Sequence, residues 1–225
     1  MNLPKFYACH KKQKARKKSI IDIYRHHFGQ SIPRKQQYWT MCASQTDENG
    51  IFQQGSELGQ ILKENLIEEE QFYGVDTKYE VIQLNKKAKP KANWFHEDFI
   101  TQMKLSLANK NFNPAIINAD LLNLDKLASM KTAELLSFMS DVKSENILLV
   151  CNWMINNPNE KKQMNIKNID RIIDNFVNLL EEKDSFQRAW RTGLWKLHHE
   201  VYKYHGSGNK SNSYLVSFMF VKKSR

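Results

Sequence analysis

Five short apolar segments alternate with amphipathic segments along this chain of 225 residues, and this alternation most constrains its fold. The apolar segments have the length and the aromatic and β-branched content of buried strands. They span residues 37–43, 71–76, 93–99, 114–124 and 146–155. Strands that alternate with helices build a parallel sheet with helices on both faces. We therefore expect an α/β fold.

The segments between these strands repeat apolar residues at helical spacing. Helices are expected at 19–29, 56–67, 100–111, 128–142 and 168–183, with a short one soon after residue 76. The C-terminal stretch differs, because "LWKLHHEVYKYHGSGNKSNSYLVSFMFVKK" (194–223) contains two strand-like runs around a turn rich in Gly, Ser and Asn. This pattern predicts a β-hairpin without an intervening helix. The expected sheet is therefore seven-stranded and mostly parallel, with one antiparallel hairpin.

Positive charge is concentrated near the N-terminus. Residues 1–40 hold ten of the 34 Lys and Arg but one of the 24 Asp and Glu, so the remaining chain has 24 bases and 23 acids. We expect two parts: a basic N-terminal arm with a helix at 1–36, and an α/β domain at 37–225. A basic arm is typical of proteins that bind the phosphate backbone of nucleic acid. A solvated tail or an arm that docks on a partner protein is the alternative.

Six residues of this arm are the predicted nucleic-acid contacts. They are Lys11, Lys12, Lys14, Arg16, Lys17 and Lys18. Farther along the chain, Trp190 and Trp195 are interleaved with basic residues in "FQRAWRTGLWKLHH". Such tryptophans either stack on bases or, more commonly, pack the last helix onto the sheet.

The cysteines and the apolar segments indicate a cellular setting. The three cysteines are far apart and odd in number, which is typical of a reducing compartment, and a cytoplasmic, intracellular location is expected. No apolar segment approaches the roughly 18 residues that a membrane-spanning helix needs, so no membrane contact is expected. The Cys and His spacings match no usual zinc pattern, so no metal site is predicted.

Five βα units followed by an antiparallel hairpin resemble the class I S-adenosylmethionine-dependent methyltransferases, over roughly residues 37–223. The resemblance implies a Rossmann-like, doubly wound sheet whose last strand is inserted antiparallel, and S-adenosylmethionine as the cofactor. In that family a Gly-rich turn after the first strand admits the cofactor. Here this turn reads "SQTDENGIFQQGSEL", without the family's E/D-x-G-x-G motif. The residues placed to line the cofactor are Cys42, Ala43 and Gly55.

Acidic residues follow the next two predicted strands. By the same resemblance, Asp76 would accept hydrogen bonds from the ribose hydroxyls, which requires an ionised acceptor at the carboxyl end of a strand. Asp98 would contact the adenine amino group, with Phe99 against the ring. The alternative for either acid is an N-cap of the following helix, because "DTKYEVIQ" and "DFITQMK" both suit that role.

The fourth strand carries Asn118 and Asp120 in "INADLLN", where many members of this family place catalytic or substrate-positioning residues. Polar side chains are costly to bury in an apolar strand, which favours a site. Asp120 would act as an acceptor or base. The D/N/S-P-P-Y/F motif of methyltransferases that modify base amino groups is missing. Two functions stay open: a methyltransferase acting on nucleic acid, and a catalytically inactive protein of this fold that binds nucleic acid or a larger assembly through its arm.

Overall fold

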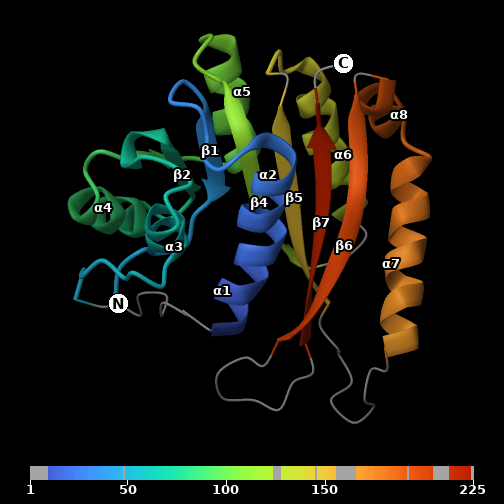
Figure 1. Ribbon diagram of the computed structural model, residues 1–225, viewed down its shortest axis with the longest axis horizontal. Helices are drawn as coiled ribbons and strands as arrows, with labels where there is room; N and C mark the ends of the chain where they lie inside the picture. Colours follow the sequence, from blue (N-terminus) through green and yellow to red (C-terminus); the bar gives the residue numbers. More distant parts are fainter. Residues whose placement is uncertain are drawn as a thin grey trace. The chain divides into compact units, whose positions relative to one another are not determined.

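The computed structural model describes residues 10–47, 49–123, 128–144, 146–155, 166–191, 193–204 and 213–223. Its seven strands form one sheet in the order β3-β2-β1-β4-β5-β7-β6 (Figure 1). They are β1 Gln37–Met41, β2 Phe72–Asp76, β3 Asn93–His96, β4 Pro114–Asn123, β5 Ile147–Ile155, β6 Leu194–Tyr204 and β7 Ser213–Lys222. The pairs β1–β2, β1–β4 and β2–β3 are parallel, and β6–β7 is antiparallel. This confirms the predicted fold, with β7 between β5 and β6.

Helices occupy the segments between these strands. They are α1 His10–Arg16, η1 Lys17–Asp22, α2 Ile23–Phe28, α3 Glu57–Lys63, η2 Glu69–Gln71, α4 Tyr79–Ala88, α5 Phe99–Ala108, α6 Ala128–Asp141, α7 Ile166–Glu181 and α8 Asp184–Arg191. The first three form one continuous helical run, in which η1 is a π-helical turn. The predicted turn of the C-terminal hairpin lies outside the described residues. Helix α8 was not predicted as a separate element.

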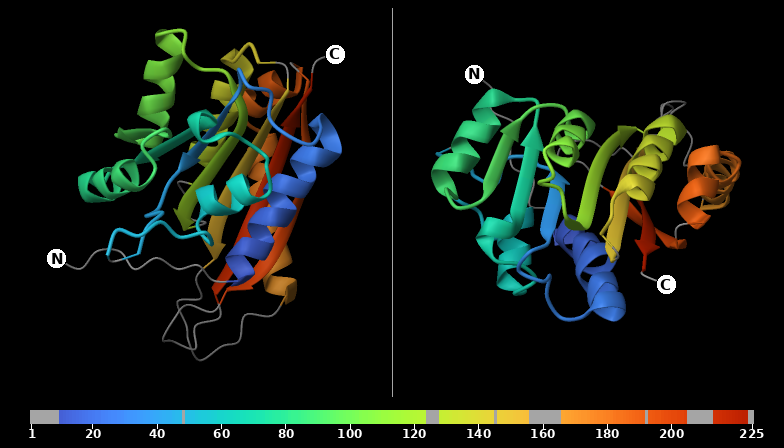
Figure 2. Two further views of the ribbon diagram at one scale, coloured as in Figure 1. Left: turned by 60° about the vertical axis from the view of Figure 1, so that its left-hand side comes forward. Right: turned by 90° about the horizontal axis from the view of Figure 1, so that it is seen from above.

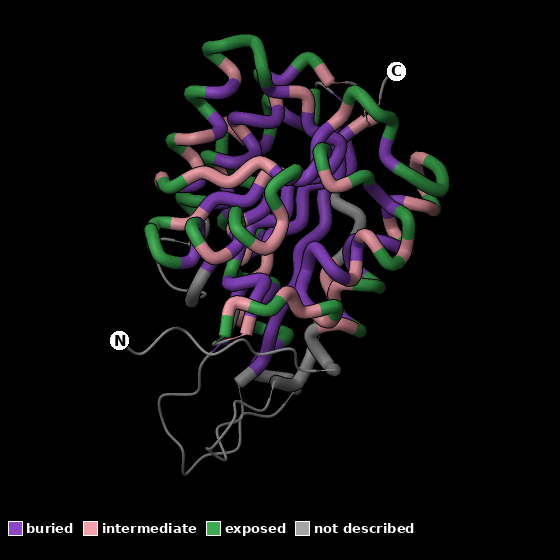
Figure 3. The backbone as a smooth tube through the Cα atoms, turned by 90° about the vertical axis from the view of Figure 1, so that its left-hand side faces the viewer, coloured by how far each residue is buried: buried purple, intermediate pink, exposed green. Residues whose placement is uncertain are grey.

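The chain divides into two compact units. The first comprises the residues up to Asp120 together with Asn146–Val150, and the second comprises Leu121–Glu145 and the chain from Cys151 onward. Most residues of β1, β4, β5 and β7 are buried, whereas β3 has only intermediate and exposed residues, and helices contribute further buried side chains (Figure 3).

Aromatic stacking joins the strands of the first unit on both faces of the sheet. On one face the rings of Tyr38 and Phe72 are parallel, with centroids 5.6 Å apart. On the other face Trp39 stacks on Tyr73 at 4.8 Å. Helices α3 and α4 cover the Tyr38 face, because Tyr38 bonds to Glu57 of α3 and Cys42 contacts Asn85 of α4. The Trp39 face packs on Phe112, just after α5. Helices therefore cover both faces, as predicted.

The second unit packs its helices against its strands through large apolar side chains. Trp153 of β5 and Phe218 of β7 both contact Phe176 of α7, at centroid distances of 6.3 and 4.9 Å. The ammonium of Lys222 is buried and donates to the carbonyls of Met139 and Val142, at 3.0 and 2.7 Å. Cations near a helix C-terminus satisfy the carbonyls that the helix leaves unpaired. Lys222 thereby attaches the end of α6 to β7.

Strand β4 continues through Asn118 to Asn123, because partners inside the first unit satisfy that amide. One predicted boundary was wrong. Strand β3 ends at His96 rather than at residue 99, because Asp98 already caps α5. Trp190 and Trp195, for which stacking on bases and packing were both open, have side chains that are 49% and 44% exposed.

Candidate cofactor-binding site

The carboxyl ends of β1 and β2 lie side by side in the first unit. The backbone N–H of Cys42 donates to the carbonyl of Val75 at 2.9 Å, which places Cys42 beside Asp76. A Cβ atom on Gly74 would lie 2.6 Å from the Trp94 ring and 3.1 Å from the Cys42 sulfur. Glycine therefore lets these strands and side chains approach closely. In open α/β sheets, ligands bind outside the carboxyl ends of the strands.

Asp76 is half-buried at the last position of β2. Its Oδ1 accepts from the backbone N–H of Lys78 at 2.7 Å, so the turn into α4 uses this carboxylate. Burial raises the pKa of Asp76, and the backbone bond at Lys78 and the nearby charges of Lys78 and His96 offset part of that effect. A carboxylate has about four acceptor positions, so this bond does not exhaust its capacity. The turn role and a ribose contact are therefore compatible.

The residues after β3 have separate environments. Asp98 is exposed, and its Oδ1 accepts from both the backbone N–H and the hydroxyl of Thr101, at 3.0 and 3.1 Å. This is the geometry of the N-cap alternative. Phe99 is the first residue of α5 and is buried, so its ring contributes to the core of the unit. Contact of either residue with adenine stays a prediction.

Hydrogen bonds of its own polar side chains and of Asn85 attach the loop between β1 and α3 to both α3 and α4. The buried Gln45 donates its backbone N–H to Asn85 Oδ1 at 2.8 Å, and its Oε1 accepts from the N–H of Leu58 at 2.9 Å. The carbonyl of Ala43 accepts from both amides, at 2.8 Å from Gln45 and 3.4 Å from Asn85. Gly55 accepts at its carbonyl from Gln13 at 3.3 Å. Side chains thus satisfy backbone groups that a Gly-rich turn leaves open.

This geometry fits S-adenosylmethionine on one side of the site. Asp76 offers the acceptor that a ribose requires, at the correct end of β2. Cys42 is buried, and this burial, followed by the charge of Asp76, raises the pKa of its thiol well above the usual value. A neutral thiol fits an apolar wall rather than a nucleophile. On the other side of the site, the Gln45 side chain already accepts a hydrogen bond from the backbone at the start of α3.

Asn118 belongs to a buried polar network in the first unit. It is 2% exposed, and its Nδ2 donates to Glu57 Oε1 at 2.8 Å and to Thr40 Oγ1 at 3.4 Å. The same Glu57 oxygen accepts from the Tyr38 hydroxyl at 2.7 Å. Arg16 lies 3.7 Å from Glu57 Oε2. The network connects α1, α3, β1 and β4, and in this arrangement the Asn118 amide has a structural role.

Asp120 lies two residues farther along β4 and is half-buried, nearer the carboxyl end of that strand. It takes part in interactions within the protein. The structure therefore separates the two predicted catalytic residues by environment: Asn118 is enclosed, and Asp120 is partly accessible. Their catalytic role stays a prediction.

The helical run at 10–28 packs against α3, and the two lie side by side (Figure 2). Arg16 and Lys17 pair with acids of that helix, and the Lys17 ammonium is 3.3 Å from Glu64. Arg25 also pairs with Glu64, at 3.1 Å. Lys14 and Lys18 are exposed. The side chains of Lys11 and Lys12 lie outside the described part of the structure.

Sequence reasoning missed three residues that shape this site. Glu57 was an ordinary acid in the first turn of a helix, and Gln45 and Asn85 were ordinary polar residues in a loop and a helix. One signal was present, because an Asn inside an apolar strand requires a buried partner. Nothing in the sequence identified that partner as Glu57.

The fold is that of the class I S-adenosylmethionine-dependent methyltransferases, with the antiparallel β7 inserted between β5 and β6. No protein-family model matches the sequence, and no curated protein matches it significantly. Among solved structures, Trm5b from Pyrococcus abyssi superposes with a TM-score of 0.50 over 99% of this chain, at 10% identity. That alignment covers 52% of Trm5b, so the chain spans about half the length of that protein.

Two further structures align with lower scores. TYW2 from M. jannaschii, solved in complex with AdoMet, has a TM-score of 0.43 at 11% identity, over 95% of this chain and 77% of TYW2. A TehB-like SAM-dependent methyltransferase from Corynebacterium glutamicum has a TM-score of 0.40 at 12% identity, over 96% and 98%. Within the described residues, no helix is long and apolar enough to cross a bilayer.

Proposed function

We propose that the chain is an S-adenosylmethionine-dependent methyltransferase that acts on nucleic acid. The observation that carries this proposal is the half-buried carboxylate of Asp76 at the carboxyl end of β2, next to Cys42 at the end of β1. On this fold, that position is where a ribose is held by an acidic side chain. The exposed Lys14 of α1 and Lys18 of η1 support nucleic acid as the substrate class.

In this proposal Asp76 holds the ribose, Asp98 and Phe99 contact the adenine, and Cys42, Ala43 and Gly55 line the rest of the cofactor. S-adenosylmethionine supplies an electrophilic methyl group when bound. The chain would orient the acceptor atom and exclude water, which contributes mainly through proximity and orientation. Asp120 would accept a hydrogen bond or a proton from the acceptor group. Asn118 would keep β4 in register through Glu57.

Calorimetric titration with S-adenosylmethionine and with its demethylated product tests this site. We expect binding, and we expect Asp76→Ala to weaken it by about tenfold or more, because hydrogen bonds to an ionised acceptor are lost. Glu80→Ala removes an exposed acid from the same region and should leave the affinity unchanged. No heat at millimolar ligand would contradict the enzyme proposal. Equal affinities for Asp76→Ala and the unmodified protein would contradict the placement of the site.

The nucleic-acid part of the proposal depends on Lys14 and Lys18, because Arg16 and Lys17 already pair with α3. Binding should weaken when both exposed lysines become alanine. Each lost phosphate contact should reduce the slope of log affinity against log salt by about 0.9 on duplex DNA, or about 0.7 on single strands. The matched control is the double variant Lys86→Ala, Lys87→Ala on α4, whose two lysines are also exposed. An unchanged slope in the Lys14, Lys18 variant would assign the basic run to another partner, such as a protein.

One observation favours the second candidate, a protein of this fold without methyl transfer that binds nucleic acid or a larger assembly. Gln45 lies in the segment that corresponds to the Gly-rich turn, and its side chain accepts from the N–H of Leu58 at the start of α3, while Asn85 of α4 accepts from the backbone N–H of Gln45. For this second candidate, the hydrogen bonds of Gln45 and Asn85 persist at every cofactor concentration, so the loop does not admit the cofactor. Nucleic-acid binding in the absence of calorimetric cofactor binding would support it.

A further inference from the structure

Gln45 is a buried residue of the candidate cofactor site, and both ends of its side-chain amide bond to the protein. Its exposed fraction is 2%. Its Nε2 donates to the carbonyl of Ala43 at 2.8 Å, and its Oε1 accepts from the N–H of Leu58 at 2.9 Å. Its backbone N–H donates to Asn85 Oδ1 at 2.8 Å. One residue thus connects the end of β1, the start of α3 and α4.

The carbonyl of Ala43 receives a second amide, because Asn85 approaches it from α4. Asn85 is fully buried, and its Nδ2 donates to the Ala43 oxygen at 3.4 Å. A carbonyl oxygen has two lone pairs. The amides of Gln45 and Asn85 therefore use both acceptor positions of this carbonyl, and neither position is left for a ligand.

Other backbone N–H groups of the same loop also bond to buried side chains. The N–H of Thr46 donates to Ser44 Oγ at 3.3 Å, and the N–H of Gly59 donates to Ser56 Oγ at 3.1 Å. Ser44, Thr46 and Ser56 are all buried. A buried polar group that loses its partner is costly, so a ligand displaces this network only if it replaces its hydrogen bonds.

The two halves of S-adenosylmethionine require different partners. The ribose brings hydroxyl donors, which need an acceptor, whereas the amino-acid tail brings an ammonium and a carboxylate, which need acceptors and donors. Asp76 is half-buried and accepts from Lys78 at 2.7 Å, which leaves further acceptor positions on its carboxylate. The site therefore has an acceptor available for the ribose, while the polar groups of Ala43 and Gln45 already bond to the protein.

We propose that this site recognises the nucleoside half of its ligand alone, and that Gln45 excludes the amino-acid half by occupying the carbonyl of Ala43. The ligand class is an adenine nucleoside with a small substituent at the 5′ carbon, and an amino-acid tail on that substituent stays in water. The inference rests on the proposed function for the nucleoside itself. It adds which part of the ligand determines affinity.

Calorimetric titration of the full chain with two matched ligands tests this proposal. S-adenosylhomocysteine and 5′-methylthioadenosine share the nucleoside and the thioether, and only the first has the amino-acid tail. Their affinities should agree within about threefold, because the tail exchanges no hydrogen bond with water for one with the protein. Gln45→Ala frees one position on the Ala43 carbonyl for the ammonium. S-adenosylhomocysteine should then bind about tenfold more tightly than 5′-methylthioadenosine.

A second variant and a control separate this effect from damage to the fold. Gln45→Glu keeps an oxygen that accepts from Leu58 and removes the donor to Ala43, so it should favour S-adenosylhomocysteine as Gln45→Ala does. The control is Gln53→Ala in the same loop. The Gln53 amide donates to Asp47 and to the carbonyl of Ile51, at 3.1 and 3.0 Å, and its removal should leave the affinity ratio near one.

If S-adenosylhomocysteine binds the unmodified chain at least tenfold more tightly than 5′-methylthioadenosine, the loop holds the tail and this inference is wrong, while the methyltransferase proposal stands. An affinity ratio near one in both Gln45 variants would overturn the role of Gln45. If neither ligand binds the unmodified chain, the proposed cofactor site fails and this inference fails with it. The two kinds of failure are therefore distinguishable.

Discussion

Replacing Glu57 with alanine is expected to lower the free energy of unfolding by about 3–5 kcal/mol, because it disrupts a buried network with a charged member. Glu57 is 7% exposed, and its Oε1 accepts from both Tyr38 and Asn118. Without this acceptor, the Tyr38 hydroxyl and the Asn118 amide lose a buried partner, which costs about 1–3 kcal/mol each. The Arg16 guanidinium also loses the nearby opposite charge.

Urea denaturation of the purified protein measures this effect, and Glu57→Gln separates its causes. Glutamine keeps the oxygen that Tyr38 and Asn118 require and removes only the charge opposite Arg16, so we expect a loss of about 1–2 kcal/mol. The control is Glu64→Gln. Glu64 also pairs with two cations of the N-terminal helix, but at a half-exposed position, where the expected loss is below about 1 kcal/mol. Equal losses for Glu57→Ala and Glu64→Gln would show that the buried network adds nothing.

The second large effect is expected for Gly59→Ala in α3, with a loss of about 3 kcal/mol in the free energy of unfolding. A Cβ atom at this position would lie 2.6 Å from the carbonyl oxygen of Gln54 and 2.7 Å from that of Gln53. Both atoms belong to the backbone of the loop before α3 and cannot rotate away. Alanine normally stabilises a helix by about 1 kcal/mol relative to glycine, so steric overlap decides the sign here.

Thermal and urea unfolding measure this loss, with Lys63→Ala as the control. Lys63 is exposed on the same helix, and its replacement should change stability by no more than about 0.5 kcal/mol. Amide hydrogen exchange should also be faster in the loop before α3 of the Gly59→Ala protein, because this loop must move away from the helix. Stabilisation by Gly59→Ala would mean that the loop does not pack against Gly59.

Both predictions bear on the candidate cofactor site, since Glu57 and Gly59 lie in the helix that follows its loop. Gly59 admits the loop backbone, and Gln45 attaches the same loop to the start of α3. A loop held from two directions requires rearrangement before a ligand can approach the α3 backbone. Calorimetry on an Asn85 variant would extend the cofactor titration, because Asn85 holds the loop from α4.

The sequence by itself determined the order of elements and the fold class. Period-two and period-3.6 patterns depend on residues close together in the chain, so five strand–helix units and the final hairpin were predictable. The position of Asp76 at the end of a strand was predictable for the same reason. Element boundaries differed from the prediction where a side chain bonds to the backbone. Asp98 caps the N-terminus of α5, so β3 ends earlier than predicted.

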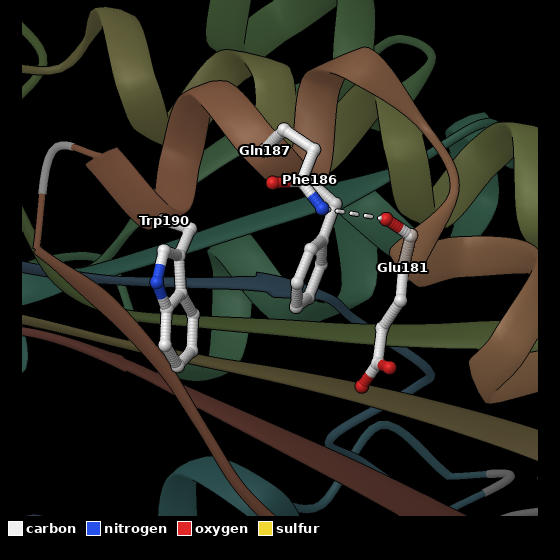
Figure 4. Close-up of a pocket in the computed structure, with 4 residues that line it drawn as sticks. All are labelled: Glu181, Phe186, Gln187 and Trp190. Atoms are coloured by element: carbon white, nitrogen blue, oxygen red, sulfur yellow. Dashed lines mark hydrogen bonds between the residues drawn. The ribbon is translucent and has the colours of Figure 1, made fainter.

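Only the tertiary structure decided which polar residues meet. Asn118 and Glu57 are 61 positions apart, and no local pattern connects them, yet the fold places a carboxylate against the Asn118 amide. Arg16, one of the predicted nucleic-acid contacts, lies 3.7 Å from that carboxylate, a partner that no local pattern indicates. Packing was one of two alternatives for Trp190, and the structure leaves its side chain 49% exposed at the corner between α7 and α8 (Figure 4). Periodicity specifies which face of an element is buried, whereas the partner across that face depends on how distant elements pack.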